Sequence, residues 1–407
     1  MSATRRVLSF LGLNQSIAGM LVVVVFVGLG ERLAERFVPV YLMALGASAI
    51  IPGLVNGLVN LLSALYSYPA GWISERFGYK RALAIFNLCS IFGYAIVLLV
   101  PHWGAVVVGS FFFLAWSALS LPATMSLVAN VLPAHKRTMG VSMHSLVRRI
   151  PMALGPVIGG VLIDSLGVLD GIRAAFGLAI VLAIFALILQ QKFVVESSPR
   201  TAHCEDPKLR QVIRGFSKNL RVLLASDILI RFCEQIPYAY MAVWAMNYSS
   251  GARISAKNFG VLTFIEMLVA LLVYIPVAWL AEKGNKKNIV GITFLFFAIF
   301  PVVLLFSTGF GMLIVAFVVR GLKEFGEPTR KGLILDLAPA DLRATTFGAY
   351  YLVRDVIVSA AAFASGWLWT VSPSCNFLVA AAFGFAGLFI FMMFFRESKE
   401  RLTEVNC

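Results

Sequence analysis

Charged residues are scarce in this chain. Lys, Arg, Asp and Glu make up 13% of its 407 residues, 60% of the residues are hydrophobic, and the mean hydropathy is +0.87. A soluble globular protein carries about 25% charged residues. The shortage of charge, together with repeated apolar runs of 18 residues or more, excludes a soluble globular fold and indicates several transmembrane helices.

Motifs for metals, nucleotides and covalent catalysis are also missing. The five cysteines are scattered without a CxxC pair, and the four histidines form no cluster with them. No Walker loop and no nucleophile–base pair can be recognised. We therefore expect no metal, no cofactor, no enzymatic activity and no direct use of ATP.

The net charge of +14 is explained by where the basic residues fall. The loops on one predicted side hold 23 of the 34 Lys and Arg residues, among them Arg330 and Lys331, whereas the opposite loops hold Arg173, Arg253 and Lys257. Basic loops stay in the cytoplasm, where they face anionic lipid head groups. This asymmetry predicts cytoplasmic termini and removes the need for a nucleic-acid partner.

Apolar segments bounded by Gly, Pro or charge clusters predict twelve transmembrane helices in two six-helix bundles. The bundles are residues 1–193 and 219–407, and the polar stretch 194–218 is the predicted cytoplasmic linker. The expected helices lie near 16–44, 49–72, 82–101, 104–132, 139–163, 172–193, 219–247, 257–281, 288–308, 310–338, 343–370 and 376–395.

The two halves of the chain resemble each other. "PAGWISERFGYKR" at 69–81 aligns with "PVAWLAEKGNKKN" at 276–288, and "LVR" occurs at both 146–148 and 352–354. "RLAE" at 32–35 similarly parallels "RFCE" at 231–234. An internal duplication of this kind is typical of secondary transporters, whose two bundles rock about a midplane site.

Over its whole length the chain resembles the major facilitator superfamily. "GWISERFGYKR" at 71–81 is similar to that superfamily's loop motif between helices two and three, with Glu in place of the usual Asp. The resemblance implies the twelve-helix fold and a role for this loop in bracing and gating the two halves. The implied gating residues are Gly71, Glu75, Arg76, Gly78, Lys80, Arg81 and, in the second half, Glu282.

Further motifs bear on the direction of transport. "GPVIGG" at 155–160 is similar to the core of an antiporter motif in helix five, although Pro151 stands where a Gly is expected. "ERLAERF" at 31–37 resembles the Glu-x-x-Glu-Arg motif of proton-coupled peptide transporters with altered spacing. Glycines at 155–160 also allow ordinary close helix packing. The arginine of many drug/proton antiporters is absent from helix four.

Four charges interrupt the first apolar segment. The run from Ile17 to Gly30 would span only about 21 Å as a helix, shorter than the hydrocarbon core of about 30 Å, so the helix must continue through the charges. Arg32 and Glu35 are i,i+3 partners that either fix helix packing or line a transport cavity.

Other ionisable residues also lie inside apolar segments, including Asp227 of the second half, and the stretch 318–328 carries Lys323 and Glu327. We expect the first-helix charges, together with Arg148, Arg231, Glu234 and Arg354, to line one water-accessible cavity between the bundles, in which carboxylates near arginines couple protonation to transport. Tyrosines on the same helices contact an organic substrate or anchor the helices at the interface. The candidate substrate or proton residues are Glu31, Arg32, Glu35, Arg36, Arg148, Arg231, Glu234, Glu266, Arg320, Glu324, Arg354, Asp355, Tyr41, Tyr238 and Tyr350.

These features predict a proton-coupled secondary transporter of a small organic molecule, monomeric, in a bacterial inner membrane. Export, as in multidrug antiporters, is favoured over uptake by the helix-five motif. The arginines favour an alternative, an importer of organic anions or peptides. A third alternative is a transporter-like sensor that binds its ligand without moving it. The predicted partners are the substrate, protons and lipid.

The predicted topology can be tested by labelling. A tag at residue 205 and a tag at the C-terminus should both report the cytoplasm, while a cysteine at Ser250 should react with an impermeant reagent from outside. Labelling of residue 205 from outside would contradict the twelve-helix arrangement.

Overall fold

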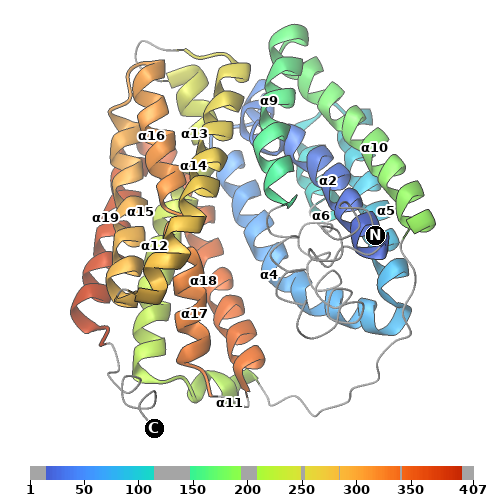
Figure 1. Ribbon diagram of the computed structural model, residues 1–407. Coiled ribbons are helices and arrows are strands. Elements are labelled where there is room, and N and C mark those ends of the chain that lie inside the picture. The colour runs from blue at the N-terminus through green and yellow to red at the C-terminus, as the bar shows by residue number, and fades with distance from the viewer. Residues whose placement is uncertain are drawn as a thin grey trace, which may run out of the picture. The chain divides into compact units, whose positions relative to one another are not determined.

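The computed structural model describes residues 15–113, 147–193, 209–248, 253–283, 285–339 and 342–396 (Figure 1). Within these ranges all regular structure is helical, without strands. Seven of the helices are long and apolar enough to cross a membrane. The prediction of an all-α membrane protein is confirmed. The count of twelve helices stays a prediction, because most of the expected helix at 104–132 and the start of the next lie outside the described ranges.

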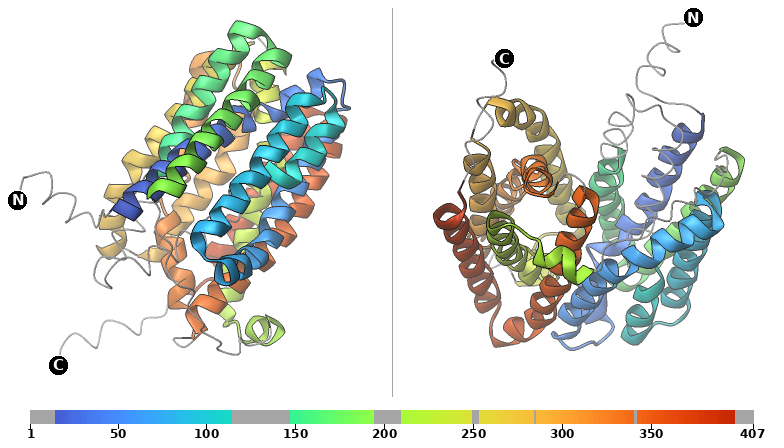
Figure 2. Two further views of the ribbon diagram at one scale, coloured as in Figure 1. Left: turned by 90° about the vertical axis from the view of Figure 1, so that its right-hand side faces the viewer. Right: turned by 90° about the horizontal axis from the view of Figure 1, so that it is seen from below.

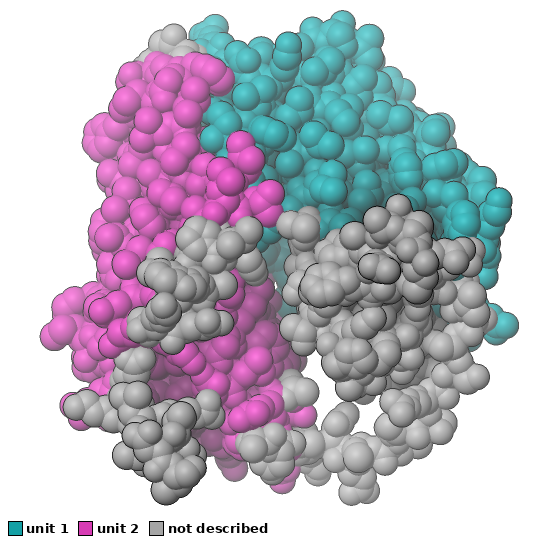
Figure 3. Space-filling view, in the orientation of Figure 1, with its two compact units in different colours: residues 1–204, 239–267 teal, residues 205–238, 268–407 magenta. Residues whose placement is uncertain are grey.

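Contacts divide the chain into two compact units (Figure 3). Unit 1 contains residues 1–204 and 239–267, and unit 2 contains residues 205–238 and 268–407. The helix α14 (Ala256–Lys283) therefore begins in unit 1 and ends in unit 2. The predicted linker 194–218 is described only from residue 209, where α11 (Leu209–Arg214) begins.

Unit 1 is built around its first helix, which packs on α9 and α10, while α5 packs on α6 and α10 (Figure 2). The described helices of unit 1, besides the first part of α14, are α2 (Gln15–Glu35), α3 (Val38–Ala44), α4 (Ile51–Phe77), α5 (Tyr79–Leu99), α6 (Trp103–Phe113), α9 (Arg149–Leu166), α10 (Val168–Phe193), α13 (Met241–Val243) and the π-helix η1 (Trp244–Tyr248).

Unit 2 packs α12 against α18 and α19, and α15 against α16, α17 and α19. Its core includes Leu220, Phe294, Tyr350 and Phe391, all fully buried. Its helices besides α11 are α12 (Lys218–Tyr238), α15 (Lys286–Leu305), α16 (Phe310–Leu322), α17 (Glu327–Asp336), α18 (Arg343–Val371) and α19 (Pro373–Phe394).

Local sequence explains several helix ends. Gly78 separates α4 from α5 with φ of 82°, a conformation that side-chain-bearing residues rarely adopt. Asn285 and Ser372 cap α15 and α19 by accepting hydrogen bonds from the N–H groups of Asn288 and Cys375.

Three of the expected helices are interrupted. The segment 16–44 breaks at residues 36–37, the segment 219–247 at 239–240 and the segment 310–338 at 323–326. Prolines Pro39, Pro237 and Pro328 lie within four residues of these breaks. Proline lacks the N–H that continues a helical ladder and clashes with the preceding turn, which explains the breaks before Pro39 and Pro328, whereas the break at 239–240 follows Pro237. Charged candidate residues lie at the first and third breaks, and Glu234 lies five residues before the second.

Candidate functional site

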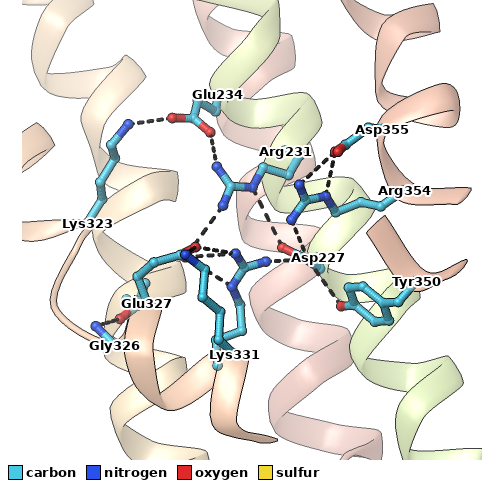
Figure 4. Close-up of polar contacts among 12 residues, drawn as sticks. Asp227, Arg231, Glu234, Lys323, Gly326, Glu327, Lys331, Tyr350, Arg354 and Asp355 are labelled. Carbon is cyan, nitrogen blue, oxygen red and sulfur yellow. Dashed lines mark hydrogen bonds and ion pairs between the residues drawn. The ribbon is translucent and has the colours of Figure 1, made fainter. Parts of the chain in front are cut away.

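A network of buried ion pairs occupies unit 2, and Asp227 on α12 is its centre (Figure 4). Asp227 is fully buried and forms an ion pair with Arg330 of α17. Its Oδ2 also accepts hydrogen bonds from Arg354 Nη1 at 3.3 Å and from the Tyr350 hydroxyl at 3.1 Å, both on α18. One carboxylate thus joins three helices.

Glu327, the first residue of α17, is a second shared carboxylate. Arg330 Nη2 lies 2.7 Å from its Oε1, Lys331 Nζ lies 3.4 Å from the same oxygen, and Arg231 Nη2 lies 3.5 Å from Oε2. The break before α17 places Glu327 and Arg330 one turn apart on the same face. Arg330 therefore bridges the two carboxylates while only 1% exposed.

Glu234 extends the network along α12. Its Oε2 accepts a hydrogen bond from Arg231 Nη1 at 2.5 Å, and its Oε1 accepts one from Lys323, which lies in the break between α16 and α17. Asp227, Arg231 and Glu234 follow one another at i,i+4 and i,i+3 and so share a helix face. Because charges removed from water are costly when unpaired, this mutual pairing is what makes their burial tolerable.

Arg354 and Arg320 add contacts with aromatic rings. The Arg354 guanidinium lies 4.2 Å from the centroid of Tyr351, and its Nε donates to Asp355 Oδ1 at 2.7 Å. Arg320 is 2% exposed and lies over the rings of Tyr238 at 5.7 Å and Phe300 at 5.1 Å. Such cation–π contacts stabilise a guanidinium in apolar surroundings.

Unit 1 carries a smaller charged cluster on the first helix. Arg32 forms the predicted i,i+3 ion pair with Glu35. Arg148, the residue before α9, lies close enough to interact with the charges of Glu31, Arg32 and Glu35. The two helices α2 and α9 pack closely here, since a Cβ at Gly155 of α9 would lie 2.5 Å from the Cβ of Arg32 of α2.

The helix break at 36–37 places a second ion pair in unit 1. Arg36 Nη2 lies 3.8 Å from Oε2 of Glu266, which is 1% exposed on α14. Next to it, Phe37 meets Phe259 edge to face, with ring centroids 5.8 Å apart. Residues 239–267 thus pack onto the interrupted first helix.

Equivalent residues of the two repeats form equivalent pairs. Arg32 with Glu35 and Arg231 with Glu234 are both i,i+3 ion pairs, and both precede a helix break. Arg354 contacts Asp227, whereas its predicted mate Arg148 contributes to the charged environment of the first helix. The pairing inside each repeat agrees with the duplication seen in the sequence.

The structure also involves residues that the sequence analysis placed elsewhere. Arg330 was expected in a cytoplasmic loop, yet it lies in α17 as one of the most buried large side chains. The Glu327–Arg330–Lys331 spacing after a proline was the available signal, since it matches the first turn of a helix with i,i+3 and i,i+4 pairs. Asp227, Glu327 and Arg330 therefore join the candidate site.

The three tyrosine candidates differ in their surroundings. Tyr350 hydrogen-bonds to Asp227 inside the network, Tyr238 lies against Arg320, and Tyr41 is fully buried among α3 and α10 near Phe176. Glu324 is half-buried at the α16–α17 break. A substrate contact for any of these residues stays a prediction.

The predicted gating loop lies between α4 and α5. Lys80 Nζ donates to the carbonyl of Gln191 at 2.8 Å, and Gln190 Nε2 donates to the carbonyl of Lys80 at 2.7 Å, which ties the start of α5 to the end of α10. Arg76 and Arg81 are exposed. The side chains of Glu75 and Glu282, and the surroundings of Gly71, lie outside the described residues, so the gating role stays a prediction.

Comparison with known proteins identifies the family. The model of the Major Facilitator Superfamily matches residues 20–251 and 223–406. The chain is 25% identical over 356 residues to the inner membrane transport protein YajR of Escherichia coli, covering 84% of this chain and 74% of that protein. It is 28% identical over 206 residues to the multidrug resistance protein MdtG of Enterobacter lignolyticus, covering 48% and 47%.

Solved structures agree with this assignment at the level of the fold. A crystal structure of the nucleoside transporter NupG superposes with a TM-score of 0.79 at 11% identity, covering 94% of this chain and 100% of that one. Because the family model matches both repeats and nearly the whole length of the chain, the chain belongs to the Major Facilitator Superfamily.

Proposed function

We propose that this secondary transporter couples its cycle to protons and moves a small organic molecule by alternating access, with export favoured. The observation that carries the proposal is the placement of carboxylate–arginine ion pairs before a helix break in both repeats, partly buried in the first repeat and joined to a buried network in the second. Buried ionisable groups inside a membrane mark substrate and proton pathways, and interrupted helices mark binding sites in secondary transporters.

The chemistry of the clusters supports proton coupling. A carboxylate that shares its cations with a neighbour can exchange a proton when one partner moves or a charged substrate arrives. Glu234 and Glu327 share Arg231 in this way, as Asp227 and Glu327 share Arg330. The predicted single cavity that would unite these groups with the first-helix cluster stays a prediction.

Uptake of an organic anion is the second candidate function. Four basic residues of unit 2, Arg320, Lys323, Arg330 and Arg354, are buried. The carboxylates of Asp227, Glu234 and Glu327 are each shared among several cations, so an anionic substrate would add a counter-charge to cations that now share one. A ligand sensor without transport remains the third candidate.

Purified protein in liposomes tests the proposal. With a pH gradient imposed, a panel of organic cations, neutral compounds and anions should contain at least one substrate whose movement collapses when the gradient is dissipated. Movement against the direction of proton flow supports export, and movement along it supports uptake. Binding of a ligand with no movement under any gradient would favour the sensor.

Glu35→Gln provides a sharper test of coupling. This change removes the charge of Glu35 but keeps its shape, so proton-driven transport should fall at least about tenfold while substrate exchange without a gradient is retained. Asp170→Asn, which alters an exposed carboxylate of the same unit, serves as the control and should change neither rate. Equal losses of both rates in Glu35→Gln would argue against a role in proton coupling.

A further inference from the structure

A carboxylate at the end of α9 caps the start of α14 within unit 1. Asp164 Oδ1 accepts a hydrogen bond from the N–H of Ala256 at 2.9 Å, and its Oδ2 accepts one from the N–H of Lys257 at 3.1 Å. These are the first two residues of α14. The first N–H groups of a helix have no intrahelical partner, and the positive end of the helix dipole favours an anion there. Ser255, the residue before α14, caps the N–H of Asn258 locally at 3.2 Å, and Asp164 caps the two preceding N–H groups from a distant helix.

Glycines bring the two helices close enough for this contact. A Cβ at Gly160 would lie 2.4 Å from the carbonyl oxygen of Ala256, and a Cβ at Gly260 would lie 2.4 Å from the carbonyl oxygen of Pro156. Neither clash could be relieved by rotating a side chain, because the opposing atoms are backbone. Small residues that allow backbones to touch are the usual basis of close helix pairs in membranes. The glycine contacts set the register that places Asp164 beside the start of α14.

A second anchor holds the same segment at its other end. The Tyr240 hydroxyl donates to the carbonyl of Ala49 at 2.7 Å and accepts from the N–H of Gly53 at 3.1 Å. Residues 239–267 are thus fastened to α4 through Tyr240 and to α9 through Asp164. On both sides this segment is covalently continuous with helices of unit 2, namely α12 and the second half of α14.

We propose that Asp164 is a positioning residue of the transport cycle, whose carboxylate holds residues 239–267 docked on α9 and must release α14 for that segment to undock. The inference rests on the proposed alternating access, in which packed helix ends separate and repack. Asp164 and Lys257 are both exposed, so water can replace the hydrogen bond from the Lys257 N–H as it breaks, whereas the bond from Ala256 is partly buried. A cap of this kind is strong enough to bias the docked state and weak enough to open repeatedly.

Cysteine reactivity measures the docking directly. Ala242 on α13 is 2% exposed, so a cysteine at this position should react slowly with maleimide while the segment is docked. The full chain would carry Ala242→Cys with the five native cysteines replaced by alanine, at positions Cys89, Cys204, Cys233, Cys375 and Cys407. Reaction rates in detergent would be compared with and without changes at Asp164.

Asp164→Ala should raise the reaction rate about tenfold, and Asp164→Asn, which keeps an acceptor oxygen but no charge, about threefold. The control Asp170→Ala removes an exposed carboxylate of the same unit that caps no other helix in the described contacts, and it should leave the rate unchanged. An unchanged rate in Asp164→Ala, or an equal increase in Asp170→Ala, would overturn the proposal. If Asp164→Ala does not fold, an unchanged rate in Asp164→Asn overturns it instead.

The labelling experiment needs no substrate, so its result is separate from the liposome assay. If the maleimide labelling rate depends on Asp164 but the protein transports nothing, the docking role stands and the proposed transport is rejected. If the protein carries out proton-driven transport but changes at Asp164 leave the labelling rate unchanged, only the docking role is rejected.

Discussion

Replacing Asp227 by alanine is expected to abolish transport and to lower the free energy of unfolding by about 3–5 kcal/mol. The change removes a fully buried carboxylate that Arg330 and Arg354 share. Both guanidinium groups would keep their charge, since arginine does not deprotonate in proteins. Asp227→Asn should be milder, because its amide oxygen can still accept the hydrogen bond from Tyr350. Thermal unfolding in detergent and transport in liposomes measure the two effects.

An exposed ion pair of the same unit provides the matched control. Lys286 Nζ lies 2.8 Å from Asp336 Oδ2, and the side chains are 41% and 37% exposed. Asp336→Ala should therefore change stability by less than about 1 kcal/mol and leave transport intact. If Asp227→Ala and Asp336→Ala lost stability and transport to a similar extent, the buried network would matter no more than an exposed ion pair.

A double variant separates structure from function at Asp227. Asp227→Asn combined with Arg330→Gln removes one charge of each sign, so much of the lost stability should return. Transport should not return if these charges act on protons or substrate. Recovery of both stability and transport would instead assign the network a purely structural role.

Gly159→Ala is expected to prevent the accumulation of a folded transporter. A Cβ at this position of α9 would lie 1.9 Å from the carbonyl oxygen of Leu33, and the backbone of α2 cannot yield without moving the neighbouring Arg32. Overpacking of a tight interface costs about 1–3 kcal/mol, and a backbone clash of this size should exceed that range. The yield of monodisperse protein and its thermal midpoint are the measurements.

Gly177→Ala is the control for this substitution. Gly177 lies in α10 of the same unit, and a Cβ there would meet nothing within 4 Å. Alanine is a better helix former than glycine by about 1 kcal/mol, so this variant should be as stable as the parent or slightly more stable. If Gly159→Ala behaved like Gly177→Ala, α2 and α9 could not pack as closely as described.

Local spacing accounts for the part of the candidate site that could be predicted. Arg32 with Glu35 and Arg231 with Glu234 are three residues apart on helices, so their pairing followed from helical geometry alone. The positions of Pro39 and Pro328 carried a signal for helix breaks, but the predicted helices at 16–44 and 310–338 ran through them. A hydropathy pattern does not register the missing N–H of proline, which ends the helix at these positions.

The sequence by itself determined that this is a duplicated, all-α membrane protein with charges inside its helices, because hydropathy, repeats and i,i+3 spacing are local properties. Tertiary structure alone decided which charges of different helices meet. Asp227 is joined to Arg354 across 127 residues and to Arg330 across more than 100, and Asp164 caps α14 from 92 residues away. Arg330 looked like a loop residue because its neighbours are polar and basic. It became buried only because α17 packs beside α12 and α18, where two carboxylates offset the cost of removing its charge from water.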